Sequence, residues 1–145
     1  MTKSFILHFE EGLPRTTAQQ KGEVILYKNG RPFIHHYRKD KVENARTELI
    51  YKMKRYAPSV PSKEAIRLNV LVCFDVKDHK LWGKYKTTRP DGDNYLKAIK
   101  DAMTDCGFWE DDAQVADERI VRTYAECGSI RVQIEDLKTP GRLKT

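Results

Sequence analysis

The alternation of apolar and polar residues predicts strands in several parts of the chain. Residues 66–76 alternate strictly, and the apolar residues Leu71 and Cys73 on the opposite side indicate that the second face is partly covered as well. We therefore expect this segment to be a central strand. The same pattern, over shorter stretches, predicts strands at residues 4–9, 119–125 and 129–135, the last two separated by a tight connection at residues 126–128.

The dipeptide Asn29-Gly30 predicts a β-hairpin. Strand-like residues 23–28 and 31–37 lie on either side of it. Asn and Gly readily adopt the two positive φ angles that a type I′ turn requires, so the two strands are expected to pair directly.

Two segments carry apolar residues at helical spacing. The first begins at Lys41 and must end near Pro58, because proline lacks the amide hydrogen that a helix interior needs. The second is expected from Asp93 to Asp105, with Gly107 placed to cap its C-terminus. The inward positions are Val42, Ala45, Leu49, Met53 and Tyr56 in the first helix and Leu96, Ile99, Ala102 and Met103 in the second. Two helices among these strands predict an α+β fold with a mixed sheet.

The length and charge of the chain narrow the classes of protein it can belong to. With 145 residues, one domain covering residues 1–145 is expected, with a flexible basic tail at residues 138–145. Lys and Arg number 27 against 21 acidic residues, which gives a net charge of +6 and favours a polyanionic partner. No apolar run approaches the roughly 20 residues of a membrane span, and the N-terminal residues lack the pattern of a secretory signal. We expect a cytoplasmic protein with no membrane partner.

The cysteines add a further exclusion. Cys73, Cys106 and Cys127 are widely spaced, odd in number and form no CxxC pair. This argues against both a disulfide framework and a zinc site, and we expect reduced, mostly buried thiols.

The densest cluster of chemically useful side chains lies between Arg89 and Val115. Asp91 and Asp93 are two positions apart in a segment that Pro90 is expected to keep extended, so their carboxylates can point the same way. Two carboxylates on one side of the chain outline a site for a hard cation. Asp93 is also placed to cap the free amides at the start of the second helix.

A lysine and an acidic pair extend this cluster. Lys97 follows Asp93 by one helical turn on the same face, where a phosphate would meet its ammonium group and the positive end of the helix. Asp111 and Asp112 come just after the second helix, and a turn of the chain can bring a third carboxylate toward the first two. A metal held by carboxylates can activate water and neutralise charge on a phosphate. Each residue alone is commonly a helix cap, a turn residue or a solvated loop residue, so the interpretation depends on their combination.

That combination resembles the RusA-type Holliday junction resolvases, a family of small, dimeric, magnesium-dependent DNA endonucleases common in phages and prophages. The family pattern is matched by Asp91-Gly92-Asp93-Asn94 at a helix start, by Lys97, and by Asp111-Asp112-Ala113-Gln114 after the helix. The resemblance implies that Asp91, Asp93 and Asp112 are catalytic carboxylates that bind the metal and that Lys97 contacts the phosphate.

The resemblance also implies a RusA-like α+β fold and a homodimer that nicks two strands of a four-way DNA junction symmetrically, in recombination and repair. Mg²⁺ is the implied cofactor, with Mn²⁺ able to substitute for it. No small-molecule cofactor is expected.

Basic and aromatic residues precede the acidic motif. This composition suits contacts to DNA phosphates together with stacking on bases or sugars, with Trp82 and Tyr85 as the aromatic members. The candidate DNA-contacting residues are Lys77, Lys80, Lys84, Lys86, Arg89 and, from the N-terminal part, Arg15.

Two other functions stay open on the sequence. In a non-catalytic basic DNA-binding module, the carboxylates would only cap the helix, stabilise turns and lie in solvated loops. Such a module would bind DNA equally with or without magnesium. A metal-dependent nuclease for flaps or RNA would use the same aspartates. Only a comparison of substrates separates the second alternative from a junction resolvase.

Overall fold

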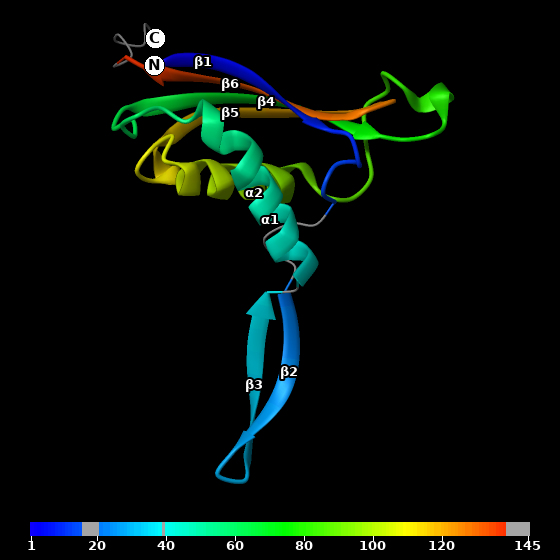
Figure 1. Cartoon of the computed structure of the whole chain (residues 1–145), viewed down its shortest axis with the longest axis vertical. Coiled ribbons are helices and arrows are strands. Elements are labelled where there is room, and N and C mark those ends of the chain that lie inside the picture. The colour runs from blue at the N-terminus through cyan, green and yellow to red at the C-terminus, as the bar shows by residue number, and fades with distance from the viewer. Residues whose placement is uncertain (16–20, 39, 139–145) are drawn as a thin grey trace, which may run out of the picture.

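The computed structural model describes residues 1–15, 21–38 and 40–138 (Figure 1). The elements are, in chain order, β1 (Thr2–Phe9), β2 (Lys21–Lys28), β3 (Arg31–Arg38), α1 (Asp40–Met53), β4 (Ala65–Asp75), α2 (Gly92–Cys106), β5 (Val115–Ala125) and β6 (Gly128–Leu137). Three short 3₁₀ turns, at Lys54–Tyr56, His79–Leu81 and Asp112–Gln114, lie between them. Of the predicted basic tail, only Lys138 falls within the described residues.

A four-stranded mixed sheet forms the centre of the molecule, in the order β1-β6-β4-β5. β4 pairs in parallel with β5 and antiparallel with β6, so the predictions of a central strand and of an α+β fold are confirmed. β5 starts four residues before the predicted strand, at Val115. The connection between β5 and β6 is tight, as expected, but the two strands are not neighbours because β4 lies between them.

Both helices cover the same face of the sheet (Figure 1). The alternating residues of β4 that face them are almost completely buried, which follows from the strict period of two in the sequence. The core is formed by Phe5, Leu7 and Phe9 of β1, Ile66, Leu68, Val70, Val72 and Phe74 of β4, Ile130, Val132 and Ile134 of β6, Ala45, Leu49 and Met53 of α1, and Tyr95, Leu96, Ile99, Ala102 and Met103 of α2. The predicted inward positions of the second helix are therefore confirmed.

The ends of the helices follow the predicted stop signals. α1 ends at Met53 and passes into a 3₁₀ turn before Pro58. Gly107 adopts the left-handed conformation, with φ 84°, and its amide returns to the carbonyls of the last turn of α2. No helix in the described part of the chain is long and apolar enough to cross a membrane.

The cysteines are less buried than predicted. All three are unpaired, but Cys73 and Cys106 are half-buried and Cys127 is exposed. Cys127 lies in the short connection between β5 and β6, at the surface rather than in the core.

The predicted hairpin is formed by β2 and β3, and it extends away from the sheet and the helices (Figure 1). Its turn residues Asn29 and Gly30 have φ 53° and 74°, as a type I′ turn requires. Direct cross-strand pairs put Ile25 and Ile34 on one face of the ribbon and Leu26 and Phe33 on the other. These side chains are exposed, by 40% at Leu26 and 62% at Ile25, so both faces of the ribbon present apolar surface.

Candidate active site at the start of helix α2

Asp91 and Asp93 lie at the very start of α2, where the chain leaves the loop after β4. Asp91 occupies the N-cap position with extended backbone, and its side chain makes no capping hydrogen bond. Asp93 is already in the first helical turn. The prediction of an extended segment carrying both residues is therefore wrong, as is that of Asp93 as the cap, because the helix begins at Gly92. Both aspartates are exposed, so their carboxylates are available to a ligand.

Asp112 is held by Lys97 of α2. The Lys97 ammonium donates to the Asp112 carboxylate and also lies 3.0 Å from a carboxylate oxygen of Asp101, one turn further along the helix. The hydrogen bond from Lys97 holds the pKa of Asp112 below its usual value, and the same bond raises the pKa of Lys97. Near neutral pH Asp112 is therefore ionised and Lys97 is protonated.

Asp111 has a structural role beside Asp112. Its carboxylate accepts from the amide of Ala113 at 2.9 Å, while the side-chain oxygen of Gln114 accepts from the amide of Asp111 at 2.9 Å. This reciprocal capping box fixes the 3₁₀ turn at residues 112–114. The turn presents Asp112, and not Asp111, to Lys97.

The three predicted metal ligands do not meet at one point. Within the residues that the structure describes, no group of three His, Cys, Asp or Glu side chains lies close enough together to hold a metal ion. Asp91 and Asp93 are together at the helix start, whereas Asp112 faces Lys97 and Asp101. The donor chemistry still suits a hard cation, because the ligands offered are carboxylate oxygens.

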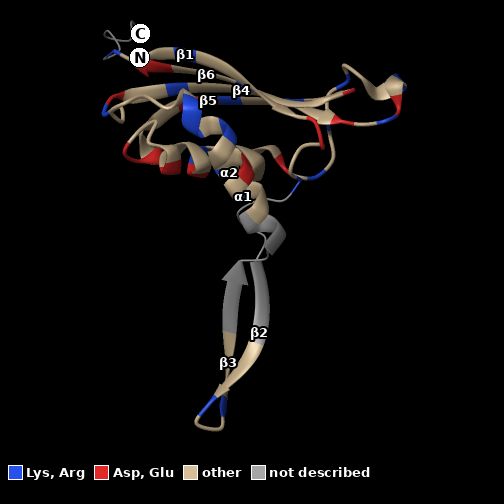
Figure 2. Ribbon diagram, in the orientation of Figure 1, with Lys and Arg blue, Asp and Glu red and all other residues tan. Residues whose placement is uncertain are grey.

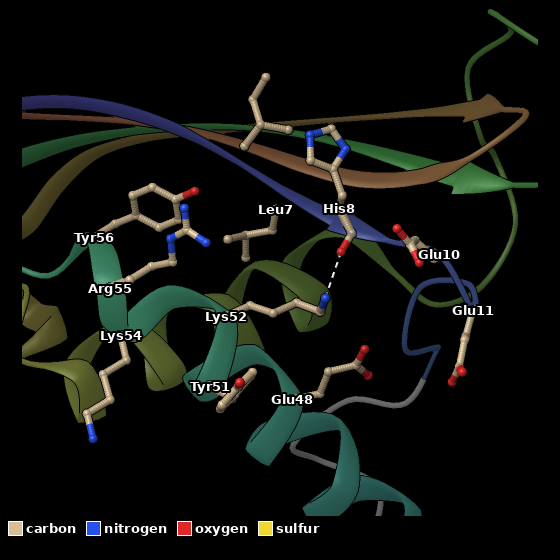
Figure 3. Close-up of a pocket in the computed structure, with 11 residues that line it drawn as sticks. Leu7, His8, Glu10, Glu11, Glu48, Tyr51, Lys52, Lys54, Arg55 and Tyr56 are labelled. Atoms are coloured by element: carbon tan, nitrogen blue, oxygen red, sulfur yellow. Dashed lines mark hydrogen bonds between the residues drawn. The ribbon is translucent and has the colours of Figure 1, made fainter.

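Two hollows in the described surface differ in their relation to these residues. One of about 410 Å³ lies beside Asp112 and is lined by Arg46, Lys97, Asp101, Thr104, Asp105, Glu110, Asp111 and Asp112. A larger one of about 890 Å³ lies between β1 and α1 and contains none of the motif residues (Figure 3). There Lys52 donates to the carbonyl of His8 at 2.7 Å. The acidic motif is thus open surface with a shallow hollow at one side.

The basic loop before α2 lies at the end of the sheet where α2 begins, and it carries several Lys and Arg residues (Figures 1 and 2). Tyr85 is 75% exposed, which leaves its ring free to stack. Trp82 is 39% exposed, but its indole NH donates to the carbonyl of Val76 at 2.9 Å. The exposed candidates for DNA contact in this loop are Lys77, Lys80, Lys84 and Arg89.

Two of the predicted DNA-contacting residues are engaged within the protein. Lys86 is 7% exposed, and its ammonium lies against the rings of Phe74 and Tyr124, so the prediction that it contacts DNA directly is not supported. Arg15 is half-exposed, but it donates to the carbonyl of Asp75 at 2.7 Å and stands 3.5 Å from the Asp75 carboxylate.

Arg122 of β5 is a residue of this region that the sequence did not reveal. Its guanidinium donates to the carbonyls of Pro90 and Thr88, at 2.7 and 3.1 Å, just before Asp91. An arginine in an alternating strand is usually a surface residue, and the partners lie more than 30 residues earlier in the chain. Sequence spacing therefore carries no signal for this contact.

Phe108 and Trp109 are core residues. Trp109 is 1% exposed and its indole NH donates to the Thr104 hydroxyl at 2.7 Å, while Phe108 is fully buried. Together they fix the start of the acidic loop, which carries Asp111 and Asp112, to the end of α2.

Comparison with known proteins defines the class. A family model described as Endodeoxyribonuclease RusA matches residues 13–135, which include the whole acidic motif, so the chain is a DNA endonuclease. It belongs to the RusA family, and the resemblance seen in the sequence is confirmed.

Two of the relatives carry names that agree with this assignment. The crossover junction endodeoxyribonuclease rusA of Lactococcus phage r1t is 27% identical over 135 residues, 92% of this chain and 98% of the relative. The crossover junction endodeoxyribonuclease RusA of Escherichia coli (strain K12) is 59% identical over 34 residues, 23% of this chain and 28% of that protein. An uncharacterised protein, YqaN of Bacillus subtilis (strain 168), is 39% identical over 51 residues, 35% of each chain.

Replacing Lys97 by Met is expected to raise the pKa of Asp112 toward its usual value, because the hydrogen bond that favours the ionised carboxylate is removed. The stability that this bond contributes is present above the usual pKa of an aspartate and is lost as the pH falls through the lowered pKa of Asp112. The stability gap between wild type and Lys97→Met should therefore close below about pH 4. Carboxyl NMR titration without metal measures the shift, with Lys84→Met as a control that removes the same charge elsewhere. An unchanged Asp112 pKa in Lys97→Met would contradict the pairing.

Proposed function

We propose that this protein resolves Holliday junctions by paired symmetric nicks in a Mg²⁺-dependent reaction, in DNA recombination and repair. The observation that carries the proposal is the start of α2, where exposed Asp91 and Asp93 directly follow an exposed basic loop in a member of the RusA family. The names of the curated relatives support four-way junctions as the substrate. Since this substrate is DNA, the cytoplasm is the proposed place of action.

Asp91, Asp93 and Asp112 are the proposed ligands of Mg²⁺, for which Mn²⁺ can substitute. When bound, the ion would lower the pKa of water and neutralise charge on the scissile phosphate. To hold the ion, Asp112 would have to leave Lys97, whose ammonium lies 3.0 Å from Asp101 as well and could then face the phosphate. The hydrogen bond to Asp101 also raises the pKa of Lys97 and would remain, so Lys97 would keep its charge throughout the neutral range. The free amides of the first turn of α2 add positive potential at the same place.

The exposed cations of the loop before α2 are the proposed contacts to the DNA backbone. Such contacts supply affinity that falls with salt and carries little sequence information. Exposed Tyr85 is the candidate for stacking at the branch point. The backbone-contacting residues are Lys77, Lys80, Lys84 and Arg89, with Arg15 through the part of its side chain left exposed.

A homodimer fits this function, because two symmetric nicks require two active sites related by a two-fold axis. The hairpin of β2 and β3 supports the proposal. It presents apolar side chains on both faces, away from the core of its own chain (Figure 1). Exposed apolar surface of this kind marks an interaction site, and we propose that the second copy covers it.

Replacing Ile34 by Glu is expected to weaken the dimer about tenfold or more, because a charge would enter an apolar contact on the ribbon. Sedimentation equilibrium measures the dissociation constant. Arg31→Ser is the matched control, since it changes the same hairpin beside the turn without touching the apolar pairs. A dimer of unchanged affinity would show that this ribbon face lies outside the interface, and a wild type that stays monomeric would contradict the homodimer.

The function itself is tested by cleavage of a synthetic four-way DNA junction in Mg²⁺ or EDTA, beside linear duplex, flap and RNA substrates. Paired nicks confined to the junction and dependent on Mg²⁺ are the expected result. Binding without cleavage in any divalent metal would favour a non-catalytic DNA-binding module. Faster cleavage of flaps or RNA would identify a nuclease of different substrate.

A further inference from the structure

Arg122 fixes the backbone immediately before α2. Its Nη1 donates to the carbonyls of Thr88 and Pro90, and its own carbonyl accepts from the amide of Lys86 at 2.9 Å. The guanidinium also lies against Gly92, where a Cβ atom would come within 3.2 Å of Nε. One side chain of β5 thus contacts the chain on both sides of Asp91.

A second cation secures the same segment from inside the protein. The buried ammonium of Lys86 lies 4.9 Å from the ring centroid of Phe74 and 5.2 Å from that of Tyr124. It donates to the Thr88 hydroxyl at 2.6 Å, and that hydroxyl lies 3.1 Å from the Tyr124 hydroxyl. A buried charge is costly unless it is compensated, and here two aromatic faces and a hydroxyl compensate it. Thr88 is therefore held by its side chain through Lys86 and by its carbonyl through Arg122.

This network is anchored in the rigid part of the fold. Phe74 and Tyr124 are directly paired residues of β4 and β5. Phe74 also makes an edge-to-face contact with Tyr95 of α2, at 5.2 Å between ring centroids. The two strands, the segment before α2 and the first turns of α2 consequently form one packed unit.

We propose that Arg122, supported by Lys86, is a positioning residue that presets Asp91 and Asp93 for the divalent cation. The inference rests on the proposed function, in which these two carboxylates bind the ion. The position of a carboxylate at a helix start depends on the backbone that carries it. A backbone that is already fixed before the ion binds loses less conformational entropy on binding. Arg122 touches neither the ion nor DNA in this role.

Replacing Arg122 by Gln is expected to weaken Mn²⁺ binding about tenfold, as observed when groups that orient metal ligands are removed. Mn²⁺ is titrated by calorimetry or electron paramagnetic resonance on the full chain without DNA. The Mg²⁺ concentration for half-maximal cleavage should rise in parallel. Junction affinity in Ca²⁺ should stay within about twofold of wild type, since phosphate contacts are unchanged. Arg122→Lys should restore part of the metal affinity.

The matched control is Arg119→Gln, which removes the same charge from an exposed position of the same strand. It should leave the Mn²⁺ affinity unchanged. Should Arg122→Gln fail to fold, Tyr124→Phe decides the question, because it removes only the hydroxyl beside Thr88. It is expected to weaken Mn²⁺ binding about threefold, which corresponds to the net contribution of one hydrogen bond.

The proposal would be overturned if Arg122→Gln folds and binds Mn²⁺ with unchanged affinity. If Arg122→Gln does not fold, an unchanged Mn²⁺ affinity in Tyr124→Phe would overturn it. So would a loss of junction affinity without a loss of metal affinity, which would make Arg122 a DNA contact. Asp91→Asn separates this failure from failure of the proposed function. If Asp91→Asn abolishes Mn²⁺ binding while Arg122→Gln leaves it intact, only the positioning role fails. If Asp91→Asn also binds Mn²⁺ normally, the proposed metal site itself is wrong.

Discussion

Replacing Asp93 by Asn is expected to lower the rate of junction cleavage about a thousandfold or more, because loss of a metal ligand forfeits several kcal/mol of transition-state stabilisation. Junction binding should be retained or become tighter, since a negative charge beside the DNA backbone is removed. Asp93 is exposed in the first turn of α2, so the protein should stay folded. Single-turnover cleavage in Mg²⁺ and junction binding in Ca²⁺ measure the two effects separately.

Asp105→Asn is the control for this substitution. Asp105 is also exposed on α2 but lies near its C-terminal end, where it pairs with Arg46. An exposed ion pair contributes little to stability, so cleavage by this variant should stay close to wild type. Equal losses of binding and cleavage in Asp93→Asn would count against a purely catalytic role for Asp93.

The largest expected effect on stability comes from Trp109. Replacing it by Ala should lower the free energy of unfolding by about 3–5 kcal/mol, because a large, fully packed ring is removed next to Phe108. The hydrogen bond from the indole NH to the Thr104 hydroxyl is lost as well. Urea unfolding followed by far-UV circular dichroism measures the change without depending on tryptophan fluorescence.

Trp109→Phe provides a graded comparison. It keeps most of the aromatic volume and removes the indole NH, so it should cost less than Trp109→Ala while leaving the acidic loop in place. Junction cleavage by Trp109→Phe should therefore stay near wild type under conditions where the variant is folded. Equal stability of Trp109→Ala and wild type would show that this ring is not part of the core.

Most of the secondary structure of this protein was determined by local sequence. The strict alternation in β4 places its largest apolar residues on one face, and this determined the strand and its orientation toward the helices. Asn29-Gly30 specified its turn, and Gly107 specified the end of α2, because few other residues adopt positive φ without strain. The acidic residues at the head of α2 were likewise recognisable, since their spacing along the chain is short.

Pairings over long distances in the sequence were decided only by the tertiary structure. The local pattern predicted β4 as a central strand, but nothing local shows that its neighbours are β5 and β6, because any strand with one apolar face could have taken either place. In the sequence, Lys86 cannot be distinguished from the other cations of the basic loop. In the structure, its ammonium lies against the rings of Phe74 of β4 and Tyr124 of β5. Asp112 likewise faces Lys97 rather than Asp91, because the capping box at Asp111 orients it. Periodicity and turn chemistry act over a few residues and can be seen in the sequence, whereas the partner of a charged side chain depends on which distant segments the whole fold brings beside it.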